Sequence, residues 1–243
     1  NVPDDARFTF IESNFRFMRG QLRLHGYEQV DGVLADLGVS SHHFDTRERG
    51  FSFRFDAPLD MRMNQRAALT AADVVNKYDH AALTRILRDY GELDAPHRAA
   101  ACIVRSREQH PLRTIDELVA CVAPVTPRGA ESKFLSKLFQ ALRIEVNGEM
   151  EALRMMLEQS ERVLRPGGRL VVIAYHSLED RTVKNFMRSG RFDGLPEKDF
   201  YGRVRSCWQV LTRKALTPSA GEVERNPRSR SAKLRAAVRL DGK

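Results

Sequence analysis

A short apolar run at residues 30–37 (VDGVLADL) is the feature that most constrains the fold of this chain. Only Asp31, Gly32 and Asp36 interrupt it, and a run of this length beside glycines is typical of a buried strand in a parallel sheet. Polar residues follow at once, at residues 38–45. Because open α/β sheets bind ligands beyond the carboxyl ends of their strands, the sequence predicts a functional loop here.

A second strand with the same arrangement is predicted at residues 170–174. The segment Arg165-Pro166-Gly167-Gly168 is expected to end the preceding helix, and the polar cluster YHSLEDR follows the strand at residues 175–181. Two parallel strands would bring both polar clusters to one edge of one sheet. The sequence therefore predicts a single site built from two segments that are far apart in the chain.

The rest of the pattern predicts an α/β domain with a helical insertion. A strand at residues 8–11 and a helix at 14–25 precede the run at 30–37, and this β-α-β order implies a parallel sheet. Between residues 70 and 137, apolar residues recur at helical spacing and prolines interrupt them, which predicts several short helices. A long helical face then leads to the second strand. The predicted parts are an α/β core in residues 1–68 and 138–243 and an all-helical insertion in residues 69–137.

The charge of the chain is concentrated near its C-terminus. The formal net charge is +8, and residues 203–243 alone hold eleven basic and three acidic residues, so the preceding part is neutral. Such asymmetry is typical of a surface that binds a polyanion, and nucleic acid is the favoured partner. A solvated basic tail is the alternative. The predicted phosphate-binding residues are Arg225, Arg228 and Arg230, in a loop rich in proline and serine.

Cysteine usage and hydropathy narrow the class of protein further. Cys102, Cys121 and Cys207 are far apart, which argues against a disulfide framework or a zinc site. His42 and His43 have no matching ligand cluster, so we expect no metal. No apolar run approaches the roughly 20 residues that span a bilayer, so we expect no membrane association and a cytoplasmic location. The sequence pattern does not indicate which oligomeric state the chain adopts.

Seven segments, in order along the chain, resemble the bacterial 16S ribosomal RNA cytosine-N4 methyltransferase family. They are DLGVSS (36–41), RGFSFR (49–54), PLDMRM (58–63), ALRIEVNGE (141–149), LRPGGRL (164–170), HSLEDR (176–181) and NPRSRSAKLR (226–235). The resemblance implies a Rossmann-like class I methyltransferase core whose helical insertion recognises the substrate. It also implies S-adenosylmethionine as cofactor, and as substrate the exocyclic N4 of a cytidine in the decoding region of 16S rRNA in the small ribosomal subunit.

One departure from the family concerns the cofactor. The family begins with a strand and a Gly-rich turn that holds the methionine end of the cofactor, followed by an acidic residue for the ribose. Neither is found in these 243 residues, so the chain is interpreted as an N-terminally incomplete member. A catalytically silent RNA-binding or ribosome-assembly module is therefore an alternative. A nucleotide-dependent oxidoreductase is disfavoured, because no dinucleotide fingerprint is present.

The resemblance transfers three cofactor contacts to this chain: Phe15 near the adenine, Asp36, and His43. His43 is a departure, since the family usually has glutamine there, and histidine differs in reach and charge state. By its residue type alone, Phe15 is more often a core residue than a ligand contact. Asp36 is the stronger candidate, because a carboxylate at the end of a buried strand needs a partner.

Methylation of a cytosine amine demands positioning more than acid–base power. The lone pair of N4 is conjugated into the ring, so the enzyme has to hold the amine in line and accept hydrogen bonds from it, with the base flipped out of any stack. The candidate catalytic residues are Asp36, Ser40, Ser41, Tyr175 and His176. The candidates for base or phosphate positioning, each of which could equally be a structural salt-bridge partner, are Asp60, Arg62, Arg143, Asn147, Asp180 and Arg181.

Overall fold

The computed structural model describes residues 5–39, 46–196, 200–202 and 206–241. The chain divides into two compact units, which are described separately. The first unit combines residues 1–38 with residues 150–243, and the second is Val39–Glu149. The predicted boundaries at residues 69 and 137 remain predictions.

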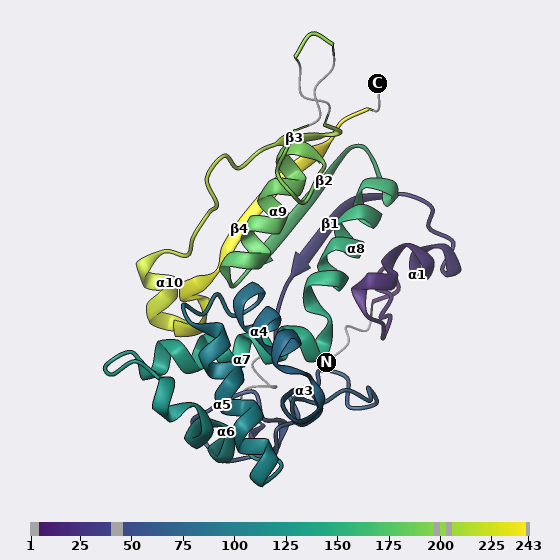
Figure 1. The fold of residues 1–243 in the computed structure, drawn as a ribbon. Helices are drawn as coiled ribbons and strands as arrows, with labels where there is room; N and C mark the ends of the chain where they lie inside the picture. Colours follow the sequence, from purple (N-terminus) through teal and green to yellow (C-terminus); the bar gives the residue numbers. More distant parts are fainter. Residues whose placement is uncertain (1–4, 40–45, 197–199, 203–205, 242–243) are drawn as a thin grey trace. The chain divides into compact units, whose positions relative to one another are not determined.

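The first unit contains a four-stranded sheet in the order β1-β2-β4-β3. Its strands are β1 (Val30–Asp36), β2 (Leu164–Ala174), β3 (Trp208–Val210) and β4 (Lys233–Arg239). β1 and β2 pair in parallel, with Asp36 opposite Ile173, whereas β4 pairs antiparallel with β2 and β3. Figure 1 shows the purple β1, the green β2 and the yellow β4 as one sheet, so the beginning, middle and end of the chain all contribute to it.

Helices connect and cover these strands. They are η1 (Phe15–Phe17), α1 (Met18–Leu24), α8 (Glu149–Val163), α9 (Ser177–Ser189), α10 (Ala220–Arg225) and η4 (Pro227–Ser231). α9 packs on β2, β3 and β4 (Figure 1). Its Phe186 ring lies 5.8 Å from the buried Trp208 ring and 5.2 Å from the Phe192 ring, measured between centroids. This aromatic cluster fixes the helix that carries the second candidate motif.

The predicted helix at residues 14–25 is confirmed as η1 followed by α1. Asn14 caps it by accepting a hydrogen bond from the Arg16 backbone N–H at 3.0 Å, as expected for an N-cap asparagine. Gln159 of α8 then joins α1 to α8. Its Oε1 accepts the Arg19 backbone N–H at 2.8 Å, and its Nε2 donates to the Arg16 carbonyl at 2.6 Å.

Three details of the predicted strands were wrong. Residues 8–11 form no strand, because a strand needs a ladder partner and none of the described residues pairs with them. β1 is parallel as predicted, but it has a described neighbour on one side only, and Leu34 is 72% exposed rather than buried. β2 begins at Leu164, immediately after α8, and so includes Arg165–Gly168. Gly168 permits this, since a Cβ there would lie 2.8 Å from the Arg165 carbonyl.

The second unit is helical and has its own apolar core. It consists of η2 (Arg47–Arg49), α3 (Ala71–Lys77), α4 (His80–Asp89), α5 (Pro96–Gln109), α6 (Ile115–Val122), η3 (Ala123–Val125) and α7 (Glu131–Asn147). Fully buried side chains from these helices, such as Val74, Leu83, Ile103, Leu118 and Leu142, form one cluster. The predicted short helices are confirmed. The long face that follows them divides into α7 and α8, because Gly148 adopts a left-handed φ of +57°.

Local sequence sets where these helices begin. Thr70 and Asp73 form a capping box at the start of α3, and Thr114 with Glu117 forms another at α6. Pro96 opens α5, where its missing N–H costs nothing. Among the described residues, no helix combines the length and the apolar character that crossing a membrane requires.

Candidate active site

The carboxyl ends of β1 and β2 bring two candidate catalytic residues into direct contact. The Tyr175 hydroxyl, just past β2, donates a hydrogen bond to Oδ1 of Asp36, the last residue of β1, at 2.8 Å. The parallel register places the strand ends side by side, and the Leu37 N–H extends the ladder to the Ile173 carbonyl at 3.0 Å. The sequence-based prediction that the two polar clusters share one edge of the sheet is confirmed for this pair.

The surroundings of Tyr175 keep its hydroxyl protonated. Burial raises the pKa of Tyr175 to about 12, and the hydrogen bond to the Asp36 carboxylate and its charge act in the same direction. The phenol is therefore a hydrogen-bond donor at neutral pH and cannot serve as a base. Among the described residues, Tyr175 is the only hydrogen-bond donor to Asp36, which is itself exposed. One oxygen of this carboxylate, Oδ2, thus keeps its full capacity to accept.

The turn between β2 and α9 holds His176 and Glu179. His176 is the N-cap of α9, where its Nδ1 accepts the Glu179 backbone N–H at 3.4 Å. The Glu179 carboxylate accepts the Tyr175 backbone N–H at 2.9 Å, and its Oε1 lies 3.2 Å from Nε2 of His176. Both side chains lie deep in this turn, with only 10% of the His176 side chain exposed. His176 therefore helps to shape the turn beside Tyr175.

The other predicted cofactor and catalytic residues are less fully described. Ser40, Ser41 and His43 lie outside the described residues. Gly38 precedes them with a left-handed φ of +90°, so a glycine suits the point where the chain turns away from β1. Phe15 lies in η1, and 41% of its surface is exposed, which leaves the ring accessible to a ligand. Its predicted contact with adenine remains a prediction.

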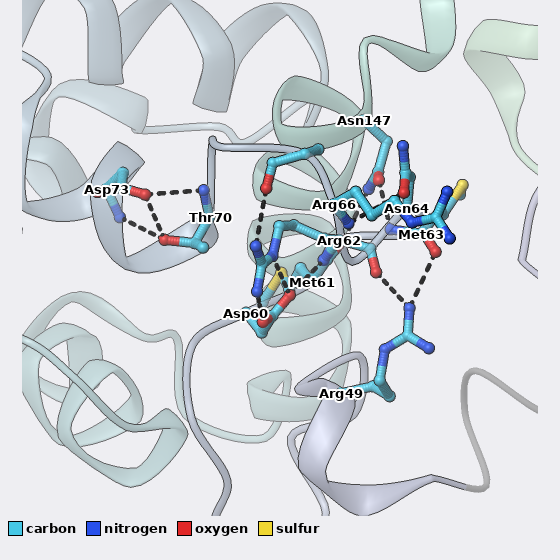
Figure 2. Close-up of polar contacts among 11 residues, drawn as sticks. Arg49, Asp60, Met61, Arg62, Met63, Asn64, Arg66, Thr70, Asp73 and Asn147 are labelled. Carbon is cyan, nitrogen blue, oxygen red and sulfur yellow. Dashed lines mark hydrogen bonds and ion pairs between the residues drawn. The ribbon is translucent and has the colours of Figure 1, made fainter.

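A separate polar network in the second unit contains three of the predicted substrate-binding residues, Asp60, Arg62 and Asn147 (Figure 2). Arg62 forms a bidentate pair with Asp60, with Nε–Oδ1 and NH2–Oδ2 distances of 2.9 and 2.6 Å, and its NH1 donates to the Ala67 carbonyl at 2.7 Å. Arg49 donates to the carbonyls of Arg62 and Met63. Burial alone would raise the pKa of Asp60, but the hydrogen bonds from Arg62 and the two nearby guanidinium charges lower it below its usual range.

Asn147 completes this network from the end of α7 (Figure 2). Its amide donates to the carbonyls of Met61 and Arg143 at 2.8 and 2.9 Å, and its Oδ1 accepts the Met63 N–H at 2.7 Å. Met61 is fully buried and adopts a left-handed φ of +58°, a conformation that costs a non-glycine residue about 1–3 kcal/mol. The network therefore holds a strained loop in one conformation.

Arg143 and Asp180 are likewise paired within the protein. Arg143 forms a bidentate ion pair with Glu149 at 2.8 and 2.9 Å, with both side chains largely buried. Asp180 on α9 accepts from Arg235 of β4 at 2.6 and 3.2 Å. Burial alone would raise the pKa of Asp180, but the hydrogen bond and charge of Arg235 lower it overall. Their predicted contacts with substrate remain predictions, as does that of the exposed Arg181.

The predicted phosphate-binding arginines lie in helical segments, not in the loop that the sequence suggested. Arg225 ends α10, and Arg228 and Arg230 lie in η4, because Ser219 and Pro227 start these two helices. All three arginines are exposed on the first unit. An exposed cluster of this kind is suited to contacts with phosphate.

Sequence reasoning did not single out Glu179 and Arg49. Both residues stand inside segments that carried the family resemblance, HSLEDR and RGFSFR. For Glu179, an available signal was its position three residues after His176, the N-cap of α9, where a glutamate commonly bonds back to the preceding backbone. Arg49 had no such local signal, since its partners Arg62 and Met63 are more than a dozen residues away.

Comparisons with known proteins agree over nearly the whole chain. The model of the MraW methylase family matches residues 2–240. Three curated relatives, each named ribosomal RNA small subunit methyltransferase H, are similar to this chain. The relative from Parabacteroides distasonis is 56% identical over 241 residues, which are 99% of this chain and 79% of the relative. The relative from Bacteroides thetaiotaomicron is 55% identical over 237 residues, which are 98% of this chain and 78% of the relative. The relative from Flavobacterium johnsoniae is 50% identical over 240 residues, which are 99% of this chain and 79% of the relative.

Proposed function

The chain belongs to the MraW methylase family, and from this premise we propose that it methylates the N4 amine of a cytidine in 16S rRNA, with S-adenosylmethionine as methyl donor. Family membership confirms the resemblance inferred from the seven sequence segments, together with a Rossmann-like α/β methyltransferase fold. The names of the relatives support an rRNA of the small ribosomal subunit as substrate. The choice of cytidine N4 is supported by the motif resemblance.

The observation that carries the proposal is the contact between Asp36 and Tyr175 at the ends of two parallel strands. An exocyclic amine presents two N–H donors, so its site needs an acceptor, and the Asp36 carboxylate retains a free oxygen. Tyr175 donates to the other oxygen and so limits rotation of the carboxylate. A fixed acceptor keeps the amine oriented, and no solvent has to reorganise around it during the reaction. Positioning of this kind is the main contribution that methyl transfer needs, because the methyl donor already has a good leaving group.

The residues of this chain fit one end of the proposed cofactor. The exposed ring of Phe15 offers an apolar face that would hold the adenosine portion. Oδ2 of Asp36, which accepts no hydrogen bond from the described residues and has two lone pairs, would accept from the adenosine as well as from the target amine. No Gly-rich turn of the type that holds the methionine portion occurs in the 243 residues. When bound, S-adenosylmethionine supplies an electrophilic methyl group on its sulfonium. The chain's own contribution is to hold the nucleophile through Asp36, whose Oδ2 would also accept the proton that the amine loses on methylation.

Recognition of the RNA is proposed to involve two surfaces. Arg225, Arg228 and Arg230 would contact phosphates, since their region carries the whole net charge of the chain. The rigid loop held by Arg62 and Asn147 in the second unit is proposed to support recognition of the target nucleotide, although the sequence analysis placed both residues in the core and assigned substrate recognition to the helical insertion at residues 69–137. A cytoplasmic location and association with the small ribosomal subunit follow from such a substrate and remain predictions.

The experiment that tests the proposal is transfer of a tritiated methyl group to small ribosomal subunits that lack the modification. The labelled RNA is digested to nucleosides, and mass spectrometry identifies the methylated nucleoside. We expect N4-methylcytidine, and no label in subunits whose target cytidine is replaced by uridine, which has no amine. Label on a ring carbon or on the ribose would contradict the N4 assignment. If the chain binds S-adenosylmethionine but transfers no methyl group to these subunits, the choice of substrate is contradicted.

The alternative of a catalytically silent RNA-binding module receives no support from the comparisons, because the relatives carry the name of a methyltransferase. Calorimetric titration with S-adenosylmethionine separates the two functions directly. An enzyme binds the cofactor and loses affinity on Asp36→Ala, whereas a silent module would bind RNA alone.

A further inference from the structure

We infer that Glu179 is a positioning residue: its buried carboxylate holds the backbone turn that brings the Tyr175 hydroxyl onto Asp36. The catalytic meaning of this inference rests on the proposed function, whereas its structural content does not. Glu179 lies in the polar cluster at residues 175–181 but is not among the predicted catalytic, cofactor-binding or substrate-binding residues, and it stands four residues after Tyr175.

The burial of Glu179 is the first observation. Its surface is 3% exposed, although an ionised carboxylate is costly to remove from water unless it is paired. Its Oε2 accepts the Tyr175 N–H at 2.9 Å. A hydrogen bond from a backbone N–H to a carboxylate is among the stronger bonds in proteins, so it restricts the backbone of Tyr175 tightly.

The second carboxylate oxygen faces the neighbouring candidate residue. Oε1 of Glu179 lies 3.2 Å from Nε2 of His176. Because Nδ1 of His176 accepts the Glu179 backbone N–H, the proton of the neutral ring is assigned to Nε2, on the side of the carboxylate. Nε2 is buried and has no well-aligned hydrogen bond within the described residues. The Glu179 carboxylate therefore holds Tyr175 by a hydrogen bond and lies beside His176.

The consequence for the site follows from the geometry of the turn. The side chain of Tyr175 extends from a backbone position that Glu179 fixes on one side, and its hydroxyl reaches Asp36 on the neighbouring strand. Without the carboxylate, the Tyr175 N–H would lose its partner and the turn would gain freedom. A displacement of about 1 Å at the reacting groups can lower a rate by roughly 100-fold.

A purely structural role is the competing explanation, since a glutamate in the first turn also stabilises the helix that follows. Glu117 provides a matched control, because its carboxylate accepts the backbone N–H groups of Arg113 and Thr114 at 2.6 and 3.1 Å at the start of α6. It therefore makes the same type of bond in the second unit, with no candidate catalytic side chain beside it. Both residues contribute to helix stability, but only Glu179 is expected to affect Tyr175.

The experiment is an NMR titration of the chain with 13C-labelled tyrosine, in which Tyr175→Phe assigns the Tyr175 signal. The charged groups that raise the pKa of Tyr175 are Asp36, Glu179 itself and Glu222 of α10. Glu179→Gln removes the charge but keeps an oxygen that can accept the Tyr175 N–H, whereas Glu179→Ala removes both. We expect the Tyr175 pKa to fall further in the alanine variant than in the glutamine variant, by about one unit, because only the former loses the contact with Asp36.

The controls make the outcomes distinct. Glu117→Ala is expected to lower the melting temperature without changing the Tyr175 pKa. If Glu179→Ala does not fold, Glu179→Asp replaces it, since it keeps the charge but shortens the side chain by one methylene and withdraws it from the Tyr175 N–H. Equal Tyr175 pKa values in the glutamine and alanine variants, neither of which carries the charge, would overturn the inference and leave Glu179 as a helix cap. The aspartate variant keeps the charge, so it is compared with the unchanged chain, and an equal Tyr175 pKa in those two would overturn the inference in the same way.

Methyl-transfer assays separate the inference from the proposed function. Glu179→Ala is expected to lower kcat about 10- to 100-fold with substantial recovery in Glu179→Gln. Full activity in both Asp36→Ala and Tyr175→Phe would contradict the proposed function, yet the NMR result for Glu179 would still stand. A normal rate in Glu179→Ala together with a shifted Tyr175 would instead remove the catalytic meaning of the positioning.

Discussion

Two aspartates, Asp60 in the second unit and Asp36 in the first, differ in how fully their carboxylates are paired within the protein. In the second unit, Asp60 pairs with Arg62, and the Asn147 side chain makes three hydrogen bonds to the backbone, two of them to the loop that carries Asp60 and Arg62 (Figure 2). In the first unit, the exposed Asp36 has a single described donor, Tyr175. A polar group that is fully paired stabilises the fold, whereas one that keeps unused capacity at a strand end is available to a ligand.

This contrast separates the roles of two aspartates that the sequence motifs alone do not distinguish. Both DLGVSS and PLDMRM carry the family resemblance and both contain an aspartate. From the pairing pattern we propose that Asp36 acts on a ligand and that Asp60 organises the protein. Substitutions should therefore separate activity from stability, and the following predictions are arranged from the largest expected effect to the smallest.

Asp36→Ala should lower methyl transfer by at least about 100-fold, roughly 3 kcal/mol, because it removes the proposed acceptor for the amine. The melting temperature should change little, since Asp36 is exposed and its loss frees only the Tyr175 hydroxyl. A tritiated-methyl assay measures the rate of methyl transfer, and circular dichroism measures the melting temperature. Asp60→Ala is the matched control and should show mainly a loss of stability. A rate near that of the unchanged chain would remove Asp36 from the active site.

Asn147→Ala should destabilise the chain by about 2 kcal/mol, because it leaves the Met63 N–H and the Met61 carbonyl without their partner beside a strained residue. Chemical denaturation measures the change. Asn64→Ala on the same loop is the control, since Asn64 is exposed and its side chain accepts only the Arg66 N–H, at 3.0 Å. Equal effects of the two substitutions would show that the network does not stabilise the loop.

Replacing Arg225, Arg228 and Arg230 by glutamine should weaken RNA binding roughly tenfold and flatten its salt dependence. Each lost phosphate contact should reduce the slope of log affinity against log salt by about 0.7 to 0.9. The control replaces Arg7, Arg88 and Arg191, which lie outside this segment. These substitutions change the charge equally, at arginines that pair with Asp5, Asp89 and Asp193 at 2.6, 2.7 and 2.7 Å.

A competing interpretation of this segment is that it supports the core. Ser229 is buried between the exposed arginines, and its hydroxyl donates to the Asn226 carbonyl at 2.8 Å. If support of the core were the main role of the arginines, the triple variant would melt earlier and retain its salt slope. Filter-binding measurements at several salt concentrations, together with thermal melts, decide between the two roles.

Asp73→Ala should destabilise the chain by about 1 kcal/mol at pH 7, because it removes the capping box of α3. Hydrogen bonds from Lys77 and Thr70 lower the pKa of Asp73 to about 2, from 3.8 for the free side chain. Since the folded state has the lower pKa, this stabilisation is complete above about pH 4 and disappears as the pH falls through about 2. The stability difference should therefore close over that range, and a constant difference would contradict the assignment.

The local features of the fold could be predicted from the sequence because they depend on neighbouring residues. The apolar run at 30–37, the helical periodicity of residues 70–137 and the helix at 14–25 each produced the expected element. The meeting of the two strand ends could also be predicted, since parallel strands share an edge. This prediction correctly placed Asp36 beside Tyr175, although 139 positions of the chain separate them.

Only the tertiary structure decided which elements find partners. Residues 8–11 have strand-like residues but no ladder partner among the described residues, and β1 lies at the edge of the described sheet, so its Leu34 is exposed. Likewise, the sequence could not tell that Asp60 is neutralised by Arg62, nor that Glu179 bonds back to Tyr175. Residue type determines what a side chain can donate or accept, but three-dimensional packing determines which of those capacities remain for a substrate.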